Sequence, residues 1–226
     1  MIDLSKSRDF FDPTLVTERV HIIGTGSVGG FVAELLARFG ITKFALYDFD
    51  TVERKNVSNQ IFTSNDVGKM KVLVVNDILQ AINPEVDVDI YTEGYIDQPL
   101  SGYVFLCVDS IELRKKIVKE NMYNTLIRGM FDFRTRLTDS QHYAADWGNV
   151  ASKYNFFKTM DFSAEEAAAE TPVSACGVTL CVAPTVRMVS ELGVMNFVQF
   201  VKTGNIRHFI NVDVLNMNIE AYPKGF

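Results

Sequence analysis

Residues 20–30 read VHIIGTGSVGG, and this stretch decides the fold. A short apolar run ends at Gly24, and Gly26 and Gly29 complete a GxGxxG pattern. Over residues 27–39, apolar side chains recur at three- and four-residue spacing, which predicts a helix. Between a strand and a helix, the first glycine permits the tight bend, the second lets the backbone approach a phosphate, and the third lets the helix pack on the strand. The stretch therefore predicts an anion-binding turn at a helix N-terminus.

The chain on either side of this motif alternates between strand-like and helix-like segments. Short apolar runs predict buried strands, and apolar residues at helical spacing predict the helices between them. The further strands are expected at 43–48, 86–91, 103–108 and 125–131, and the further helices at 67–82, 111–122 and 184–202. This alternation predicts an α/β, Rossmann-like fold with a mostly parallel sheet and helices on both faces.

The pattern changes after residue 131. Residues 142–147 predict an antiparallel strand, and 208–214 and 217–222 predict a closing hairpin. Residues 151–171 look irregular, and the small, acidic run 163–170 within them could form a short exposed helix but has no apolar face. We therefore expect a mobile crossover loop there. The expectation is a single domain over residues 1–226, divided into an N-terminal arm (1–19), a nucleotide-binding core (20–131) and a crossover loop, long helix and hairpin (132–226).

Composition narrows the function classes. The 226 residues are 47% hydrophobic and 22% charged, which is typical of a globular protein, and the net charge of −6 disfavours nucleic acid as a partner. No apolar run reaches the ~18 residues that a membrane helix needs. Three cysteines without a CxxC pair and three scattered histidines predict a reducing compartment and no structural zinc site. We expect a cytoplasmic protein with no membrane or nucleic-acid partner.

The residues after the second expected strand indicate which nucleotide is bound. Asp48 ends that strand and suits a ribose hydroxyl, as an NAD(P)-binding oxidoreductase would also require. Asn56, Asn59 and Gln60 follow, and their amides can donate to phosphate oxygens. A lysine after Val67-Gly68 can neutralise phosphate charge, and Asp109 lies at the carboxyl end of a later strand, where it can hold Mg²⁺. This set favours a nucleoside triphosphate over a dinucleotide.

In order and spacing, these motifs resemble the ThiF/MoeB/HesA superfamily, the adenylating core shared with the ubiquitin-activating enzymes. The family pattern is GxGxxG, DxDxV, NxxRQ, VGxxK and an aspartate followed by an arginine. The matching positions are Gly24 to Gly29, Asp48-Asp50-Val52, Asn56 to Gln60, Val67-Gly68 to Lys71, and Asp109 to Arg114. The closing segment resembles the short ThiF-like proteins of phage and plasmid gene clusters.

The resemblance implies an ATP-dependent adenylyltransferase, a homodimer that activates the C-terminal carboxylate of a ubiquitin-like protein or peptide. Asp48 would bind the ribose, and Asp109 would hold Mg²⁺. The triphosphate would be held by Asn56, Gln60 and Lys71, with Asp50 and Asn59 completing the expected cofactor-binding set. Lys69 is the rival of Lys71, and the family spacing favours Lys71.

Two departures from the pattern bear on activity. Asn59 stands where the family has an arginine, which leaves open a catalytically inactive ThiF-like partner subunit or compensation by another cation such as Arg54. Arg8 lies in the N-terminal arm, where family dimers carry an arginine that reaches the partner's active site. The alternative for Arg8 is an ordinary surface arginine.

Cys176 is the candidate nucleophile. It lies eight residues before Pro184, the spacing at which family members with sulfur or thioester chemistry carry a cysteine in the crossover loop. A thiolate there could attack the acyl-adenylate and release AMP. The alternative is a small apolar residue packed at a helix entrance. Cys107 and Cys181 are expected to be structural.

Overall fold

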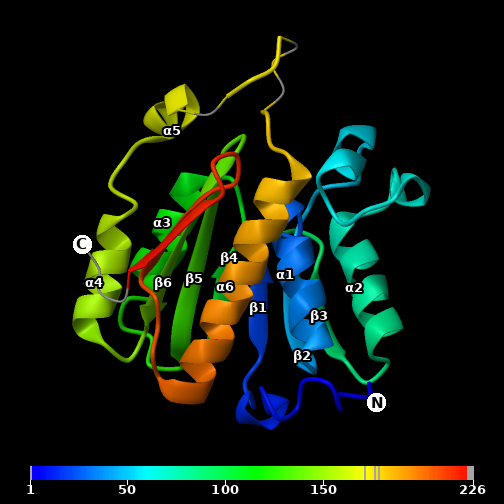
Figure 1. Ribbon diagram of the computed structural model, residues 1–226, viewed down its shortest axis with the longest axis vertical. Coiled ribbons are helices and arrows are strands. Elements are labelled where there is room, and N and C mark those ends of the chain that lie inside the picture. The colour runs from blue at the N-terminus through cyan, green and yellow to red at the C-terminus, as the bar shows by residue number, and fades with distance from the viewer. Residues whose placement is uncertain (1, 171, 176, 178, 223–226) are drawn as a thin grey trace.

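The computed structural model describes residues 2–170, 172–175, 177 and 179–222. Among these residues an eight-stranded sheet runs through the centre, in the order β3-β2-β1-β4-β5-β6-β7-β8 (Figure 1). Neighbours from β3 to β5 pair in parallel, and β6, β7 and β8 are added antiparallel. The strands are β1 Val20–Ile23, β2 Lys43–Tyr47, β3 Asp87–Tyr91, β4 Gly102–Leu106, β5 Ile127–Thr135, β6 Asp139–Asp146, β7 Phe209–Asp213 and β8 Asn218–Tyr222.

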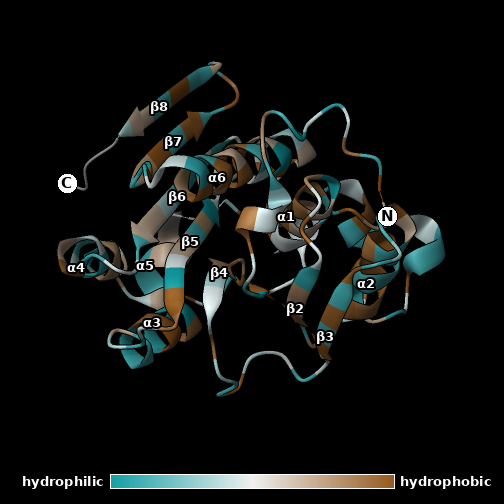
Figure 2. Cartoon of the chain, turned by 90° about the horizontal axis from the view of Figure 1, so that it is seen from below, coloured by the Kyte–Doolittle hydropathy of each residue, from teal (hydrophilic) through white to brown (hydrophobic). Residues whose placement is uncertain are grey.

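Helices cover both faces of this sheet (Figure 2). α1, α2 and α6 bury the larger apolar cluster, which includes Phe31, Phe105 and Phe197. α3 and α4 cover the opposite face around Met130 and Trp147. β1 and β4 are buried at every position, as expected of parallel strands covered on both faces. The helices are α1 Ser27–Arg38, α2 Lys71–Ile82, α3 Ile111–Glu120, α4 Val150–Lys158, α5 Ala164–Glu170 and α6 Ala183–Thr203.

The α/β, Rossmann-like class and the antiparallel C-terminal portion predicted from the sequence are confirmed. α6 has Pro184 in its first turn, and Gly204 ends it in the left-handed conformation with φ of 72°. Proline lacks only an N–H that has no partner at that position, and glycine adopts positive φ without a Cβ penalty. Within the described residues, no helix combines the length and the apolar character that crossing a membrane requires.

The expectation of irregular chain over residues 151–171 is wrong, because α4 and α5 occupy most of it. Asn149 caps α4 by accepting a hydrogen bond from the Ser152 N–H at 3.1 Å. Phe156 anchors the same helix edge-on against Trp147, at 6.1 Å between ring centroids. A reciprocal pair of hydrogen bonds between Ser163 and Glu166 starts α5. Capping and alanine-rich propensity therefore outweigh the missing apolar face of α5.

Candidate active site

The glycine turn after β1 is packed against the chain that leaves β4. Gly24 has φ of 90°, and a Cβ added to it would lie 2.8 Å from the Cys107 carbonyl oxygen and 2.9 Å from the Val108 nitrogen. A Cβ on Gly29 would lie 1.8 Å from the Gly24 carbonyl oxygen, so neither position accepts a side chain. A Cβ added to Gly26 would have Gln60 Oε1 as its nearest neighbour, at 3.8 Å, which leaves room for a ligand to approach the turn.

Asp48, at the end of β2, holds this turn in place. Its Oδ2 accepts hydrogen bonds from the Thr25 N–H at 2.7 Å and the Thr25 hydroxyl at 3.1 Å. Its Oδ1 accepts one from the Asp50 N–H at 2.9 Å. A carboxylate has about four acceptor positions, so these three bonds leave capacity for a ribose hydroxyl. The predicted ribose role therefore fits the geometry and stays a prediction.

Lys71 pairs with Asp50. Lys71 opens α2 and is only 7% exposed, and its Nζ lies 2.6 Å from Asp50 Oδ2. The Lys71 N–H also donates to the Asp50 carbonyl at 2.9 Å. Lys69 differs, because it is exposed and pairs with Asp66 at 3.0 Å. The structure thus brings Lys71, and not Lys69, against the polar turn that follows β2.

The three amide side chains expected near the phosphates have different surroundings. Asn56 Oδ1 accepts from the Glu53 N–H at 2.8 Å, and Asn59 Nδ2 donates to the Cys181 carbonyl at 3.2 Å. Asn56 therefore stabilises its own loop, and Asn59 ties that loop to the segment just before α6. Gln60 Oε1 is buried and has no hydrogen-bond partner among the described residues. An unpaired buried acceptor is costly and calls for a donor, which a phosphate oxygen does not supply, so the predicted donation from the Gln60 amide to phosphate stays a prediction.

Asp109 is exposed and directly follows β4 and the Cys107–Val108 segment that contacts Gly24. Ser110 then caps α3 by accepting from the Leu113 N–H at 3.2 Å. The described residues contain no cluster of three histidine, cysteine or carboxylate side chains that could hold a metal. Mg²⁺ in nucleotide sites commonly uses one or two carboxylates together with phosphates and water. A single carboxylate beside an open glycine turn fits that mode.

Arg8 lies at the far end of α1 from the glycine turn. The N-terminal arm packs there, with the Phe10 and Phe11 rings 6.4 and 5.7 Å from the Phe39 ring. α1 has 12 residues and so is about 18 Å long. Within one chain, the structure does not bring Arg8 to the other predicted site residues. Its predicted role across a dimer remains a prediction.

The structure describes two of the three cysteines, Cys107 and Cys181. Cys176 lies outside the described residues. Cys107 packs against the core, and burial raises the pKa of its thiol. Cys181 is half-buried, and burial raises its thiol pKa as well. Neither environment favours a reactive thiolate, in agreement with the structural role expected for both residues.

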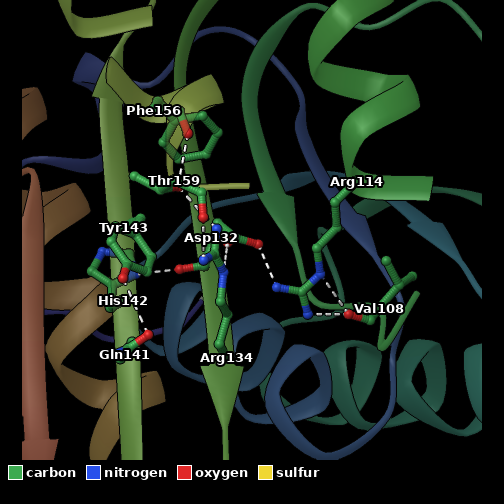
Figure 3. Close-up of polar contacts among 9 residues, drawn as sticks. All are labelled: Val108, Arg114, Asp132, Arg134, Gln141, His142, Tyr143, Phe156 and Thr159. Carbon is green, nitrogen blue, oxygen red and sulfur yellow. Dashed lines mark hydrogen bonds and ion pairs between the residues drawn. The ribbon is translucent and has the colours of Figure 1, made fainter. Parts of the chain in front are cut away.

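The sequence reading missed a buried ion-pair network beside Asp109. Asp132 is fully buried on β5 and accepts from Arg114 Nη1 at 2.6 Å and from Arg134 Nε at 2.8 Å (Figure 3). The predicted strand ended at residue 131, so Asp132 and Arg134 fell outside it. The alternation of apolar and charged side chains in Phe131-Asp132-Phe133-Arg134 is the signal that predicts a longer strand.

Comparison with known proteins identifies the family. The ThiF family model matches residues 11–224, and the chain belongs to this family. It is 40% identical over 116 residues to ubiquitin-like modifier-activating enzyme 5 of Drosophila erecta, a match covering 43% of this chain and 29% of that protein. The same enzyme of Caenorhabditis elegans is 32% identical over 120 residues, covering 43% of this chain and 27% of the relative. The chain therefore matches less than a third of the length of these relatives.

Solved structures show the same fold. Escherichia coli MccB with ATP superposes with a TM-score of 0.71 at 20% identity, covering 93% of this chain and 65% of MccB. PaaA superposes with a TM-score of 0.70 at 20% identity, covering 94% of this chain and 65% of PaaA. At this level of identity, the likeness establishes the fold alone.

Proposed function

We propose that this protein is an ATP-dependent adenylyltransferase that activates the C-terminal carboxylate of a ubiquitin-like protein or peptide. One observation carries the proposal: the glycine turn after β1 packs directly against the Cys107–Val108 segment that leads to Asp109. An anion-binding helix N-terminus and an exposed carboxylate thus share one edge of the sheet. The names of the relatives support this reading, since they are modifier-activating enzymes.

The reaction requires that two anions approach each other. The substrate carboxylate attacks the α-phosphorus of ATP, a phosphorus–oxygen bond breaks, and pyrophosphate leaves. The N-terminus of α1 and Lys71 would offset the negative charge, and Asp48 would orient the ribose. When bound, Mg²⁺ would neutralise phosphate charge from the side of Asp109. Lys71 would release Asp50, whose half-exposed carboxylate can be solvated by water, and would bind phosphate instead.

Three further features of the proposal concern assembly, product and cellular location. A homodimer would allow Arg8 of one subunit to approach the glycine turn of another. Cys176 would capture the acyl group from the adenylate as a thioester, with release of AMP. The protein would act in the cytoplasm, where the thiol stays reduced.

Nucleotide binding and pyrophosphate exchange test the proposal. Calorimetric titration with ATP, NAD and NADP, each with Mg²⁺, should give binding to ATP. Binding to NAD or NADP alone would favour the oxidoreductase alternative and refute adenylation. Incorporation of labelled pyrophosphate into ATP should then require a ubiquitin-fold protein or a peptide with a free C-terminal carboxylate.

A second candidate is a catalytically inactive partner subunit. The observation in its favour is that Asn59 carries no charge and donates its amide to the Cys181 carbonyl. ATP binding without exchange across a panel of carboxylate substrates would support this candidate. Exchange with any of them would exclude it.

A further inference from the structure

The ion-pair network of Arg114, Asp132 and Arg134 has no place in the function proposed so far. Asp132 is 0% exposed and Arg114 is 6% exposed, so both charges are removed from water. Figure 3 shows the Asp132 carboxylate between the two guanidinium groups. Taking such charges out of water is expensive, and well-packed apolar residues often stabilise a core equally well. Because stability alone does not require this buried network, its role is inferred from what each guanidinium holds in place.

On one side, the Arg114 guanidinium hydrogen-bonds to the backbone of Val108, immediately before Asp109. Its Nε donates to the Val108 carbonyl at 2.9 Å, and its Nη2 bonds to the same oxygen. Its Nη1 donates to Asp132 Oδ1 at 2.6 Å. A planar guanidinium held at three nitrogens has one orientation, so Asp132 determines where the Val108 carbonyl and the following residue lie.

On the other side, Arg134 holds the chain that leaves α4. Its Nε donates to Asp132 Oδ2 at 2.8 Å, and its Nη1 and Nη2 bond to the carbonyl and hydroxyl of Thr159 at 2.7 and 2.9 Å. Its guanidinium also lies 5.2 Å from the centre of the Phe162 ring. From α3, Lys115 donates to the Phe162 carbonyl at 2.5 Å. Residues 159–162 are thereby fastened to the sheet just before α5.

We propose that Asp132 is a positioning residue whose two carboxylate oxygens hold two segments in place, the Asp109 turn of the candidate active site through Arg114 and residues 159–162 through Arg134. The inference rests on the proposed function for its consequence. The Asp109 turn lies against the glycine turn, and residues 159–162 precede the crossover segment that contains Cys176. One buried carboxylate thus couples the position of the Asp109 turn to that of residues 159–162.

Asp132→Asn tests this assignment, because it keeps the size of the side chain and removes the charge. Amide hydrogen exchange should become faster in both 106–110 and 159–162. Titration of the protein with ATP should show affinity lowered about tenfold when Mg²⁺ is present, at the lower end of the usual loss for support around a metal ligand, because Asp132 acts on Asp109 through Arg114 and the Val108 carbonyl. ATP affinity without Mg²⁺ should change much less, a difference that a general loss of stability would not produce.

Two matched variants divide the network. Arg134→Gln should speed exchange in 159–162 alone, and Arg114→Lys should speed it in 106–110 alone, because lysine keeps the charge and loses the planar fork. Arg128→Gln is the control, because Arg128 lies on β5 with Asp132 but pairs with Glu18, which lies outside the network. It should change neither segment.

The outcomes separate this inference from the proposed function. If amide hydrogen exchange in Asp132→Asn is unchanged in either segment, the assignment is overturned. If Asp132→Asn does not fold, the two arginine variants decide. An Arg114 or Arg134 variant that speeds amide hydrogen exchange in both segments together also overturns the assignment. If the wild-type protein binds no ATP, the proposed function is refuted. The amide hydrogen exchange of the variants still tests the positioning role of Asp132 independently.

Discussion

Replacing Lys71 by methionine should separate nucleotide chemistry from folding. The Lys71 stem is buried at the start of α2, with 7% of the residue exposed, while its ammonium lies 2.6 Å from Asp50. Methionine retains most of the apolar stem and removes only the charge. The Asp50 side chain is 51% exposed, so water can solvate its carboxylate once the lysine is gone.

The two expected magnitudes differ widely. An ion pair with one solvent-exposed partner is worth about 1 kcal/mol or less, so the melting temperature should fall by roughly 2–4 °C at most. Loss of a group that stabilises developing charge costs about 10²–10³ in rate, which is about 3–4 kcal/mol. The variant should therefore remain folded and lose almost all pyrophosphate exchange.

Lys69→Met is the matched control, because Lys69 lies two residues away, is exposed and pairs with Asp66. It should retain exchange within about twofold and melt within about 2 °C of the wild type. Pyrophosphate exchange and differential scanning calorimetry on the three proteins measure both quantities. Equal activity of the two variants, or loss confined to Lys69→Met, would refute the assignment of Lys71 to the phosphates.

Three other outcomes are expected. At ~100 times its Kd, Mg-ATP should stabilise the fold by about 2.7 kcal/mol, and a melting shift with NAD alone would contradict adenylation. Asp109→Ala should lose ~10²–10³ in pyrophosphate exchange, whereas Cys176→Ala should keep exchange and lose any thiol-sensitive adduct. Burial lowers the pKa of His21 and His142 to about 4. Because this is below the unfolded value near 6.5, the associated stability is complete above pH 6.5 and is lost as the pH falls towards 4, by about 3 kcal/mol per histidine. Urea unfolding that is independent of pH over this range would show that these histidines are not held neutral by burial.

Local sequence patterns accounted for most of the architecture. The bend at Gly24, the helix that follows it and the left-handed end of α6 at Gly204 depend on residues within a few positions of each other. The predicted strands and helices agree with the structure to within a few residues, except at the end of β5, at the start of α2 and in α4 and α5. The helix predicted from residue 67 begins at Lys71, because Gly68 has a positive φ of 91°. The exceptions in α4 and α5 arise because capping hydrogen bonds and aromatic packing decided between helix and loop.

For the candidate active site too, some features could be predicted from the sequence and others could not. The residue types at Asp48, Lys71 and Asp109 indicated nucleotide chemistry, because few other chemistries need donors, a lysine and a carboxylate at the carboxyl ends of parallel strands. Which groups already have partners was not visible in the sequence. Asn59 bonds to Cys181 across 122 residues, and Arg8 lies a helix length away from the glycine turn.

The sequence by itself determined the strand–turn–helix motif, the alternation that builds the sheet and the polar residues at its carboxyl edge, since all of these follow from spacing along the chain. Only the tertiary structure decided that Asp132 holds Arg114 and Arg134 together, that Lys71 pairs with Asp50, and that the glycine turn packs against the Asp109 segment. Such contacts depend on how the strands align and where the helices dock on them. Packing of the whole core sets that arrangement, and no local pattern encodes it.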